Sequence, residues 1–561
     1  MDPDRSSEEK ARGLTIDLGF AWATLPSGRQ FAFVDVPGHV RFLKNMLAGV
    51  GAVDTCVFVV AATEGWKPQS EEHLRILEVL GVEHGIVALT KVGLVDDELR
   101  QLARNDVEEH VAGTFLEHAP IVEVDAPSGI GLAQFMEAVD QLLASAPLAT
   151  DRGRPRLWID RSFTVRGAGT VVTGTLTGGH LAVHDVLEAV PGPFSDGAPL
   201  SVRVRGLQTH KQSLPEVAPG YRVAVNLLGA SHAQLFRGQA LVRPHQWSPT
   251  TTIDASLRVL GSLDHEVARR GAYRAYVGSG QHSVALRILG ATVLIPGETG
   301  LVRMHFPVAL PLLPGDRYVL RESGRSETVG GGEVLDVAPV LAAARARPDR
   351  SVDRVVAERG WILPDELERL TGERREPNLG ARWIVDRDLL EETKARILQA
   401  VADAGPLGLD VTPLSERDRA VLSTLGDVAH DGTRARLAQD MGEDPLAEHP
   451  YLDDLEMSPF APPDPVDAGV SRDELRELVR SGRVIESDGC YFSAHAMSEA
   501  ARAVARLLGD HPEGVTASQV REMLGTTRKY ALPILGHLDV TGVTRRRGDV
   551  RIGGPRLPAD R

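Results

Sequence analysis

Cysteine is scarce in this 561-residue chain, which holds two, Cys56 and Cys490, far apart in sequence. Two such residues give no disulfide framework, and their scarcity is typical of a reducing compartment, so we expect a cytoplasmic protein. The sequence has no run of about 18 apolar residues, and a membrane span is not expected. The first ten residues are polar and mixed in charge, unlike a signal peptide.

An excess of positive charge is also missing. The chain has 62 Lys and Arg against 77 Asp and Glu, a formal net charge of -15. This balance excludes a chain that binds polyanions nonspecifically along its whole length, although a local basic patch can still bind nucleic acid. Hydrophobic residues make up 42% of the chain, enough to bury several cores, and the length is typical of three to five domains.

Strand-like and helix-like patterns alternate over residues 1–148. The strand-like runs are 31–34, 55–61, 86–90 and 121–124, and the helical ones are 40–49, 69–80, 96–111 and 132–144. The alternation predicts an α/β domain with a parallel sheet and helices on both faces. Ligands of such sheets bind at the carboxyl ends of the strands, where Asp35, Thr90-Lys91 and Asp125-Ala126 stand.

The stretch Asp35-Val36-Pro37-Gly38-His39 is the most informative in this domain. An acidic residue at a strand end can hold a water on Mg²⁺, and the glycine lets a backbone N–H approach a γ-phosphate. A histidine beside that glycine can orient an attacking water. The alternative is a surface turn with an ordinary histidine, and the neighbouring segments favour the phosphate interpretation.

Arg12-Gly13-Leu14-Thr15-Ile16-Asp17-Leu18-Gly19, followed by the Asp35–His39 stretch, resembles the selenocysteine-specific translation elongation factors. The resemblance implies a P-loop-type GTPase domain with GTP and Mg²⁺ as cofactors. It assigns Mg²⁺ binding to Thr15 and Asp35, and the γ-phosphate contact to Gly38. His39 would be the catalytic residue that orients water. The guanine would be bound by Thr90, Lys91 and Ala126.

Two departures from that family stand out. The phosphate-binding pattern Gly-x-x-x-x-Gly-Lys-[Ser/Thr] occurs nowhere, and 14 residues precede Thr15, so the first strand is also missing. A misplaced start and a genuine deletion both explain this. The guanine motif ends in Gly93 where the family has Asp, and losing such a contact costs a discrimination of roughly 10⁴. We therefore predict a poor GTPase. Asp96 and Asp97 stand at the wrong offset and are expected to cap the next helix.

Residues 152–248 and 252–340 are rich in short β-like runs with glycine turns, which predicts two antiparallel barrels. The first, through its 163–174 motif, resembles the second domain of elongation factor Tu relatives. That resemblance assigns a selenocysteine pocket to Asp160, Arg161 and Arg222, because paired arginines favour a selenolate. The alternative is a set of rim salt bridges. We interpret the histidines at 265, 282 and 305 as ordinary.

Residues 341–561 combine short helical windows with β-like pairs, which predicts tandem winged helices, about four in number. The segment 430–470 fits least well and is expected to be loop-like. The last unit resembles the message-binding end of the same family. Its expected RNA-binding residues are Arg528, Lys529, Tyr530, Arg545, Arg546, Arg547 and Arg551. A solvated basic face is the alternative.

Taken together, these patterns predict a GTP-dependent factor that delivers selenocysteinyl-tRNA to UGA codons on the ribosome while tethered to an mRNA hairpin. We expect a monomer that makes no membrane contact. A nucleotide-independent RNA-binding remnant of such a factor is the alternative, favoured by Gly93 and the missing phosphate loop. A DNA-binding regulator is a third interpretation, which the two barrels argue against.

Overall fold

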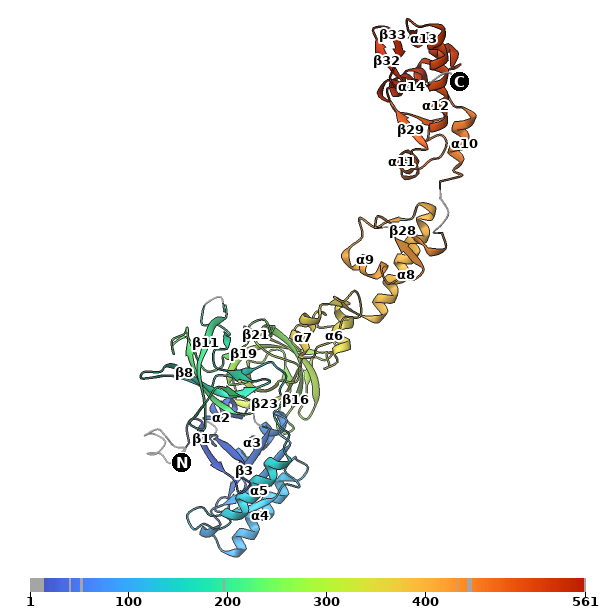
Figure 1. Cartoon of the computed structure of the whole chain (residues 1–561). Helices are drawn as coiled ribbons and strands as arrows, with labels where there is room; N and C mark the ends of the chain where they lie inside the picture. Colours follow the sequence, from blue (N-terminus) through green and yellow to red (C-terminus); the bar gives the residue numbers. More distant parts are fainter. Residues whose placement is uncertain are drawn as a thin grey trace. The chain divides into compact units, whose positions relative to one another are not determined.

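The computed structural model describes residues 15–39, 42–50, 54–194, 197–430, 432–440 and 446–558. The chain divides into two compact units, Met1–Arg387 and Asp388–Arg561 (Figure 1). No helix in these described ranges is long and apolar enough to cross a membrane.

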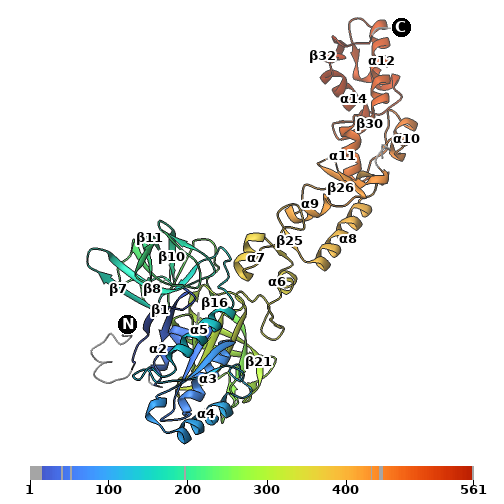
Figure 2. The ribbon, with the colours of Figure 1, turned by 60° about the horizontal axis from the view of Figure 1, so that its bottom comes forward.

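The first unit contains a parallel sheet in the order β3-β4-β5. Three helices, α3, α4 and α5, lie around it (Figure 2). The bounds are β3 Thr55–Ala61, α3 Pro68–Val79, β4 His84–Thr90, α4 Asp97–Val111, β5 Ile121–Val124 and α5 Leu132–Ser145. Side chains alternate along β4: Ile86 packs with Val139 of α5, whereas Val87 and Leu89 belong to the cluster that includes α3 and α4. The expected helices on both faces are therefore confirmed.

A second, separate ladder precedes this sheet. β1 (Gly19–Thr24) pairs antiparallel with β2 (Gln30–Asp35), and α2 (Leu43–Val50) follows. This differs from the expectation in two ways: the strand at 19–24 was missed, and the 31–34 run is not paired in the parallel sheet. The antiparallel pairing has a local reason, because a short turn through Gly28 at φ 85° joins the two strands.

Two barrels follow, as expected. In the first, the path β10-β15-β6-β8-β14-β11 closes because β10 also pairs with β11. The strands of this sheet are β6 Arg156–Trp158, β7 Arg161–Val165, β8 Gly169–Thr177, β10 Val186–Val190, β11 Leu200–Thr209, β12 Gln212–Leu214, β14 Arg222–Leu228 and β15 Ala240–Val242. β9 Leu181–Ala182 and β13 Glu216–Val217 form a separate two-stranded ladder. The second is the closed barrel β16-β21-β19-β18-β22-β23. Its strands are β16 Thr250–Val259, β18 Tyr273–Val277, β19 Gly280–Leu289, β21 Thr299–Leu310, β22 Arg317–Glu322 and β23 Glu327–Asp336, and β17 Val267–Ala268 pairs with β20 Val293–Leu294 in a separate ladder.

The second barrel packs directly against the sheet domain. Glu72 of α3 accepts a hydrogen bond from Thr328 at 2.9 Å. A Cβ at Gly331 would lie 2.2 Å from Cγ1 of Val79, so only glycine permits this approach of α3 to β23. One hydrophobic cluster runs through both layers. The arrangement fixes the carboxyl ends of β3, β4 and β5 relative to the barrels.

A small helical subdomain completes the first unit. It comprises α6 Val352–Arg359, β24 Trp361–Ile362, α7 Pro364–Thr371 and β25 Ile384–Val385. Val352 and Leu367 are buried in the same cluster as the second barrel, and Arg354 pairs with Asp336 at 2.9 Å. The boundary between compact units therefore lies about 46 residues after the composition change at 341.

The residues that the structure describes in the second unit form three further helix-and-hairpin modules. The first has α8 Arg387–Asp403, β26 Leu409–Asp410, α9 Glu416–Leu422, β27 Val428–His430 and β28 Arg434–Leu437. The next has α10 Pro450–Met457, α11 Arg472–Arg480, β29 Val484–Ser487 and β30 Cys490–Ser493. The last has α12 Ala494–Asp510, β31 Val515–Thr516, α13 Ala517–Met523, α14 Arg528–Val540, β32 Thr544–Arg547 and β33 Val550–Gly553. The expected loop at 430–470 instead contains β28 and α10, although 431 and 441–445 lie outside the described residues.

Candidate functional site

The predicted Mg²⁺ ligands come together in the structure. Thr15 donates a hydrogen bond from Oγ1 to Oδ2 of Asp35 at 3.4 Å, although 20 residues separate them. Two oxygen donors suit Mg²⁺, which usually keeps several waters and takes other ligands from phosphates. Within the described ranges, no group of three or more His, Cys, Asp or Glu gathers in a metal-binding arrangement, so such an ion would depend on the nucleotide for its remaining ligands.

The loop that follows Asp35 is open. Gly38 is exposed, and a Cβ there would meet nothing within 4 Å. The backbone carbonyl of His39 accepts from the N–H of Phe42 at 2.8 Å, and the two rings lie 6.0 Å apart. Residues 40 and 41 lie outside the described residues. Among the described residues, nothing covers the backbone at Gly38.

The predicted guanine-binding residues converge at one sheet edge. Thr90 ends β4 and is paired in register with Val124, so Lys91 and Ala126 follow neighbouring strand ends. Lys91 adopts a left-handed conformation, with φ 59°, and its Nζ lies 3.3 Å from Glu64. Ala126 is exposed. The parallel sheet therefore brings together residues that are about 35 positions apart.

Gly93 lies in the short 3₁₀ helix η2, Val92–Leu94, beside the same edge. Its neighbour in space is Asp125, a buried residue to which the sequence analysis gave no role. Asp96 caps α4 as predicted, because its side chain accepts from the N–H of Leu99 at 2.8 Å. The Asp96 carboxylate is therefore used to cap α4 and does not replace the carboxylate that Gly93 lacks.

Two of the three predicted pocket residues form a buried ion pair in the first barrel. Arg222 donates to Asp160 through Nε at 3.0 Å and Nη2 at 2.8 Å. Thr173 donates to the same carboxylate at 2.5 Å, and the Arg222 guanidinium lies 3.4 Å from the ring centroid of Phe20. The Asp160 side chain is 8% exposed. The carboxylate of this pair is therefore largely shielded from solvent and holds hydrogen bonds from two side chains.

Arg161, the third pocket residue, is held differently. Its guanidinium lies 3.2 Å from Asp17, with side chains 28% and 40% exposed. Arg237 reaches the other oxygen of Asp17 at 2.8 Å and also donates to Asn45 at 2.9 Å. Burial alone would raise the pKa of Asp17, but the hydrogen bond and charge of Arg237 lower it below its ordinary value of 3.8. Arg161 and Arg237 thus bind the first barrel to the segment that follows Thr15, through Asp17.

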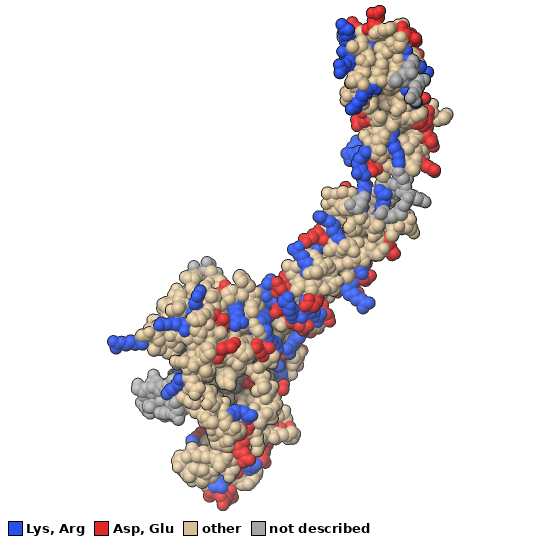
Figure 3. All heavy atoms as spheres, viewed as in Figure 1, with Lys and Arg blue, Asp and Glu red and all other residues tan. Residues whose placement is uncertain are grey.

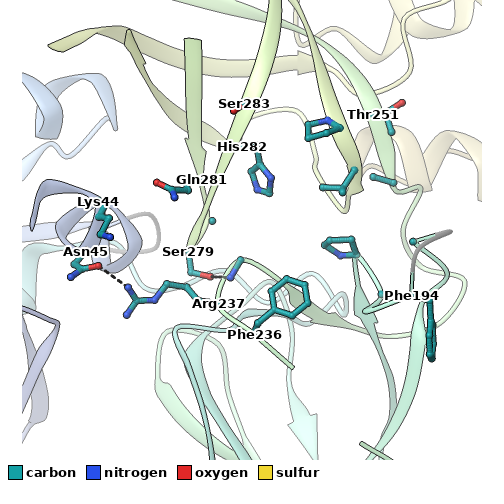
Figure 4. Close-up of a pocket in the computed structure, with 18 residues that line it drawn as sticks. Lys44, Asn45, Phe194, Phe236, Arg237, Thr251, Ser279, Gln281, His282 and Ser283 are labelled. Carbon is teal, nitrogen blue, oxygen red and sulfur yellow. Dashed lines mark hydrogen bonds between the residues drawn. The ribbon is translucent and has the colours of Figure 1, made fainter. Parts of the chain in front are cut away.

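Sequence reasoning missed Arg237, and no motif marks it, since its partners Asn45 and Asp17 lie 192 and 220 residues away. Arg237 also lines a cavity of about 790 Å³ between the two barrels and α2 (Figure 4). His282 faces this cavity, and none of the described residues hydrogen-bonds its buried Nε2. Burial lowers the pKa of His282 to about 4, so the side chain is neutral at neutral pH.

The predicted RNA-binding residues divide into two groups. Basic side chains gather at the edge of the last module, near β32 (Figure 3). The exposed ones are Arg528, Lys529, Arg545, Arg546 and Arg547. Tyr530 is half-buried, its ring 6.5 Å from that of Phe492, with Lys529 Nζ 5.0 Å from it. Arg551 differs from the expectation, because it is buried and pairs with Asp539 at 2.9 Å. This ion pair joins β33 of the hairpin to α14.

Family models match both ends of the chain. Residues 2–145 match the elongation factor Tu GTP-binding domain, and residues 506–552 match the winged helix of elongation factor SelB. A bacterial selenocysteine-specific elongation factor structure, EF-Sec, shares the fold over 99% of this chain and 95% of that one, with a TM-score of 0.65 and 23% identity. SelB from Methanococcus maripaludis bound to the GTP analogue GppNHp covers 58% of this chain and 75% of its own, with a TM-score of 0.52 and 23% identity.

Curated relatives span nearly the whole chain. The selenocysteine-specific elongation factor of Desulfomicrobium baculatum is 31% identical over 98% of this chain and 95% of its own length. That of Escherichia coli strain K12 is 30% identical over 98% and 94%. Likeness of this extent covers the sheet domain, both barrels and the winged helices together. The chain therefore belongs to the family of selenocysteine-specific elongation factors.

Proposed function

We propose that this chain carries selenocysteinyl-tRNA to the ribosome, uses GTP and Mg²⁺ as its switch, and is tethered to an mRNA hairpin by its last winged helix. The observation that carries the proposal is the joint likeness of the GTP-binding domain and the terminal winged helix in one chain, at 31% identity over 98% of its length. A GTP-binding domain alone, or a winged helix alone, would fit many functions.

The switch would act at the edge that carries Thr15, Asp35 and Gly38. When bound, Mg²⁺ and GTP supply the charge that orders such segments and the phosphate that is hydrolysed. Thr15 and Asp35 would hold the ion, and Gly38 would donate its N–H to the γ-phosphate. His39 would orient the attacking water. The 3.4 Å hydrogen bond between Thr15 and Asp35 supports this assignment.

The aminoacyl end would lie at the Asp160, Arg161 and Arg222 cluster. The pair of Arg222 with Asp160 is buried, so breaking it would leave a charge without a partner. The pair of Arg161 with Asp17 is partly exposed and is worth about 0–1 kcal/mol. Arg161 is therefore the guanidinium that can exchange its partner for a selenolate, while Arg222 keeps the pocket in shape.

The first experiment is nucleotide titration of the purified chain with Mg²⁺, from micromolar to millimolar GTP and GDP. The absent phosphate loop predicts a weak interaction, with a Kd above about 1 μM, because that loop supplies several phosphate donors. Sub-micromolar affinity would contradict the prediction of a poor GTPase. No binding at all would favour the nucleotide-independent remnant.

The second experiment compares selenocysteinyl-tRNA with seryl-tRNA at saturating GTP analogue. We expect Arg161→Met to reduce the preference for the selenocysteinyl form by about tenfold, the loss of one charge-assisted contact. Arg205→Met is the matched control, because Arg205 is an exposed arginine of the same barrel that donates to the carbonyl of Ala168 at 3.2 Å. Equal preferences in the wild type and both variants would refute the pocket.

A further inference from the structure

Space, rather than backbone geometry, requires glycine at position 93. Gly93 is not among the glycines with positive φ, so its backbone conformation would accept any residue. A Cβ built there would lie 2.7 Å from Oδ2, 3.0 Å from Cγ and 3.5 Å from Cβ of Asp125. A side chain at 93 and the carboxylate of Asp125 therefore compete for one place. The carboxylate occupies it, reaching in from the neighbouring strand end.

The Asp125 carboxylate is held in a defined orientation. The backbone N–H of Asp125 donates to the carbonyl of Ile130 at 3.0 Å, which closes the loop after β5. Its Oδ2 accepts from the N–H of Ser128 at 3.3 Å and from the hydroxyl of the same residue. Asp125 is 7% exposed, and no described residue hydrogen-bonds its Oδ1. One oxygen is thus anchored and the other remains an acceptor.

A carboxylate at this place has a chemical use. Guanine presents two donors on one edge, N1–H and the N2 amino group, and a carboxylate is the side chain that accepts from both. The flanking residues Lys91 and Ala126 belong to the same edge of the sheet. Position 93 would supply this acceptor in the family but has no side chain here. The carboxylate of Asp125 fills the space that a Cβ at position 93 would need.

We propose that Asp125 is the residue that selects guanine in this protein, replacing from β5 the carboxylate that Gly93 lacks. This inference rests on the proposed function, since it requires that the domain bind a guanine nucleotide. It changes one expectation of the sequence analysis: the Gly93 substitution no longer implies that discrimination against other bases is lost. A purely structural role, in which Asp125 only closes the turn through Ser128, is the competing explanation.

The decisive variant is Asp125→Asn, tested by equilibrium titration with GDP and with XDP, the xanthine analogue. Xanthine has a carbonyl in place of the guanine amino group, so an asparagine amide complements it, accepting from N1–H and donating to that carbonyl. We expect the wild type to prefer GDP. The variant should lose at least about tenfold in GDP affinity and gain XDP affinity, because hydrogen bonds to charged groups are worth that much.

A swap tests the geometry. Asp125→Ser alone should abolish the guanine preference, and Gly93→Asp with Asp125→Ser should restore it, because the second acid then occupies the vacated place. Gly93→Asp alone should weaken GDP binding, since two carboxylates would crowd within about 3 Å. Ser128→Ala is the control that keeps the charge but removes one anchor, and its guanine preference should persist. Thermal melting of each variant checks its fold.

The outcomes separate the two proposals. Wild-type protein that binds no guanine nucleotide at millimolar concentration overturns both. Wild type that binds GDP, with Asp125→Asn unchanged in its preference, overturns this inference alone. If Asp125→Asn unfolds, the double swap decides, and a folded double variant without guanine preference also overturns it.

Discussion

The hairpin of the last module allows a quantitative test of RNA binding. In the β32–β33 ladder Arg546 lies opposite Arg551, and side chains of opposite residues share a face. Thr544 and Arg551 are buried on that face, whereas Arg546, nearer the turn, is exposed. Arg545 and Arg547 alternate with these positions and therefore share the opposite face, where both are exposed. This pair of neighbouring arginines is thus placed for joint phosphate contact, apart from Arg546.

We therefore change Arg545 and Arg547 to alanine together. Each phosphate contact contributes about 0.7 to 0.9 to the slope of log K against log salt concentration, so losing two should reduce the slope by roughly 1.4 to 1.8. Affinity at any one salt concentration should fall across all hairpin sequences, since phosphate contacts carry no sequence information. Fluorescence anisotropy of a labelled message hairpin with the full chain, over 50–300 mM KCl, measures both.

The matched control is Arg546→Ala on the same strand. Its Nε already donates to the carbonyl of Gly548 at 3.2 Å, so its removal should change the slope by about half a unit or less. An unchanged slope in the double variant would refute the face assignment. An Arg546→Ala effect as large as that of the double variant would do the same.

Three further predictions concern stability. Asp160→Ala should lower the free energy of unfolding by about 3 kcal/mol, because it leaves the partly buried Arg222 without its carboxylate. Arg161→Ala should lower it by less than about 1 kcal/mol, because the pair of Arg161 with Asp17 is more exposed. Equal effects of the two variants in urea unfolding would contradict the assignment of a buried pair. Between pH 6.5 and about 4, His282 is protonated in the unfolded chain but neutral in the folded one. The free energy of unfolding should therefore decrease as the pH is lowered through this range, by at most about 3 kcal/mol from this group. In His282→Phe that part of the slope should vanish, as differential melting at several pH values would show. Asp96→Ala should cost about 1 kcal/mol through loss of the α4 cap, and a neutral result in thermal melting would argue against it.

Local patterns were enough to find most elements, since periodicity and turn residues act over a few positions. The helix 132–144 and the strands 55–61 and 121–124 agree with the structure to within a residue. The strand at 19–24 was not predicted, because Gly-Phe-Ala-Trp-Ala-Thr lacks the alternation of polar and apolar residues that marks a half-buried strand. The burial of Arg551 was not predicted, because the sequence does not show which face of a hairpin is covered.

The candidate site divides in the same way. The family motifs predicted roles for Thr15, Asp35, Asp160 and Arg222, and the structure brings Thr15 to Asp35 and Arg222 to Asp160. Arg237 and its clamp on Asp17 could not be predicted, since an ion pair across 220 residues leaves no periodic signal. The relation of Gly93 to Asp125 was hidden for the same reason, 32 positions apart on neighbouring strand ends.

By itself, the sequence determined the family, the order of domains and the chemistry expected at each strand end. Those properties depend on residue identity and short-range spacing. Only the tertiary structure decided which charges are already paired, which arginines face outward and which acid fills the space beside Gly93. Such properties follow from how distant segments pack, and packing is set by the whole core rather than by any local stretch.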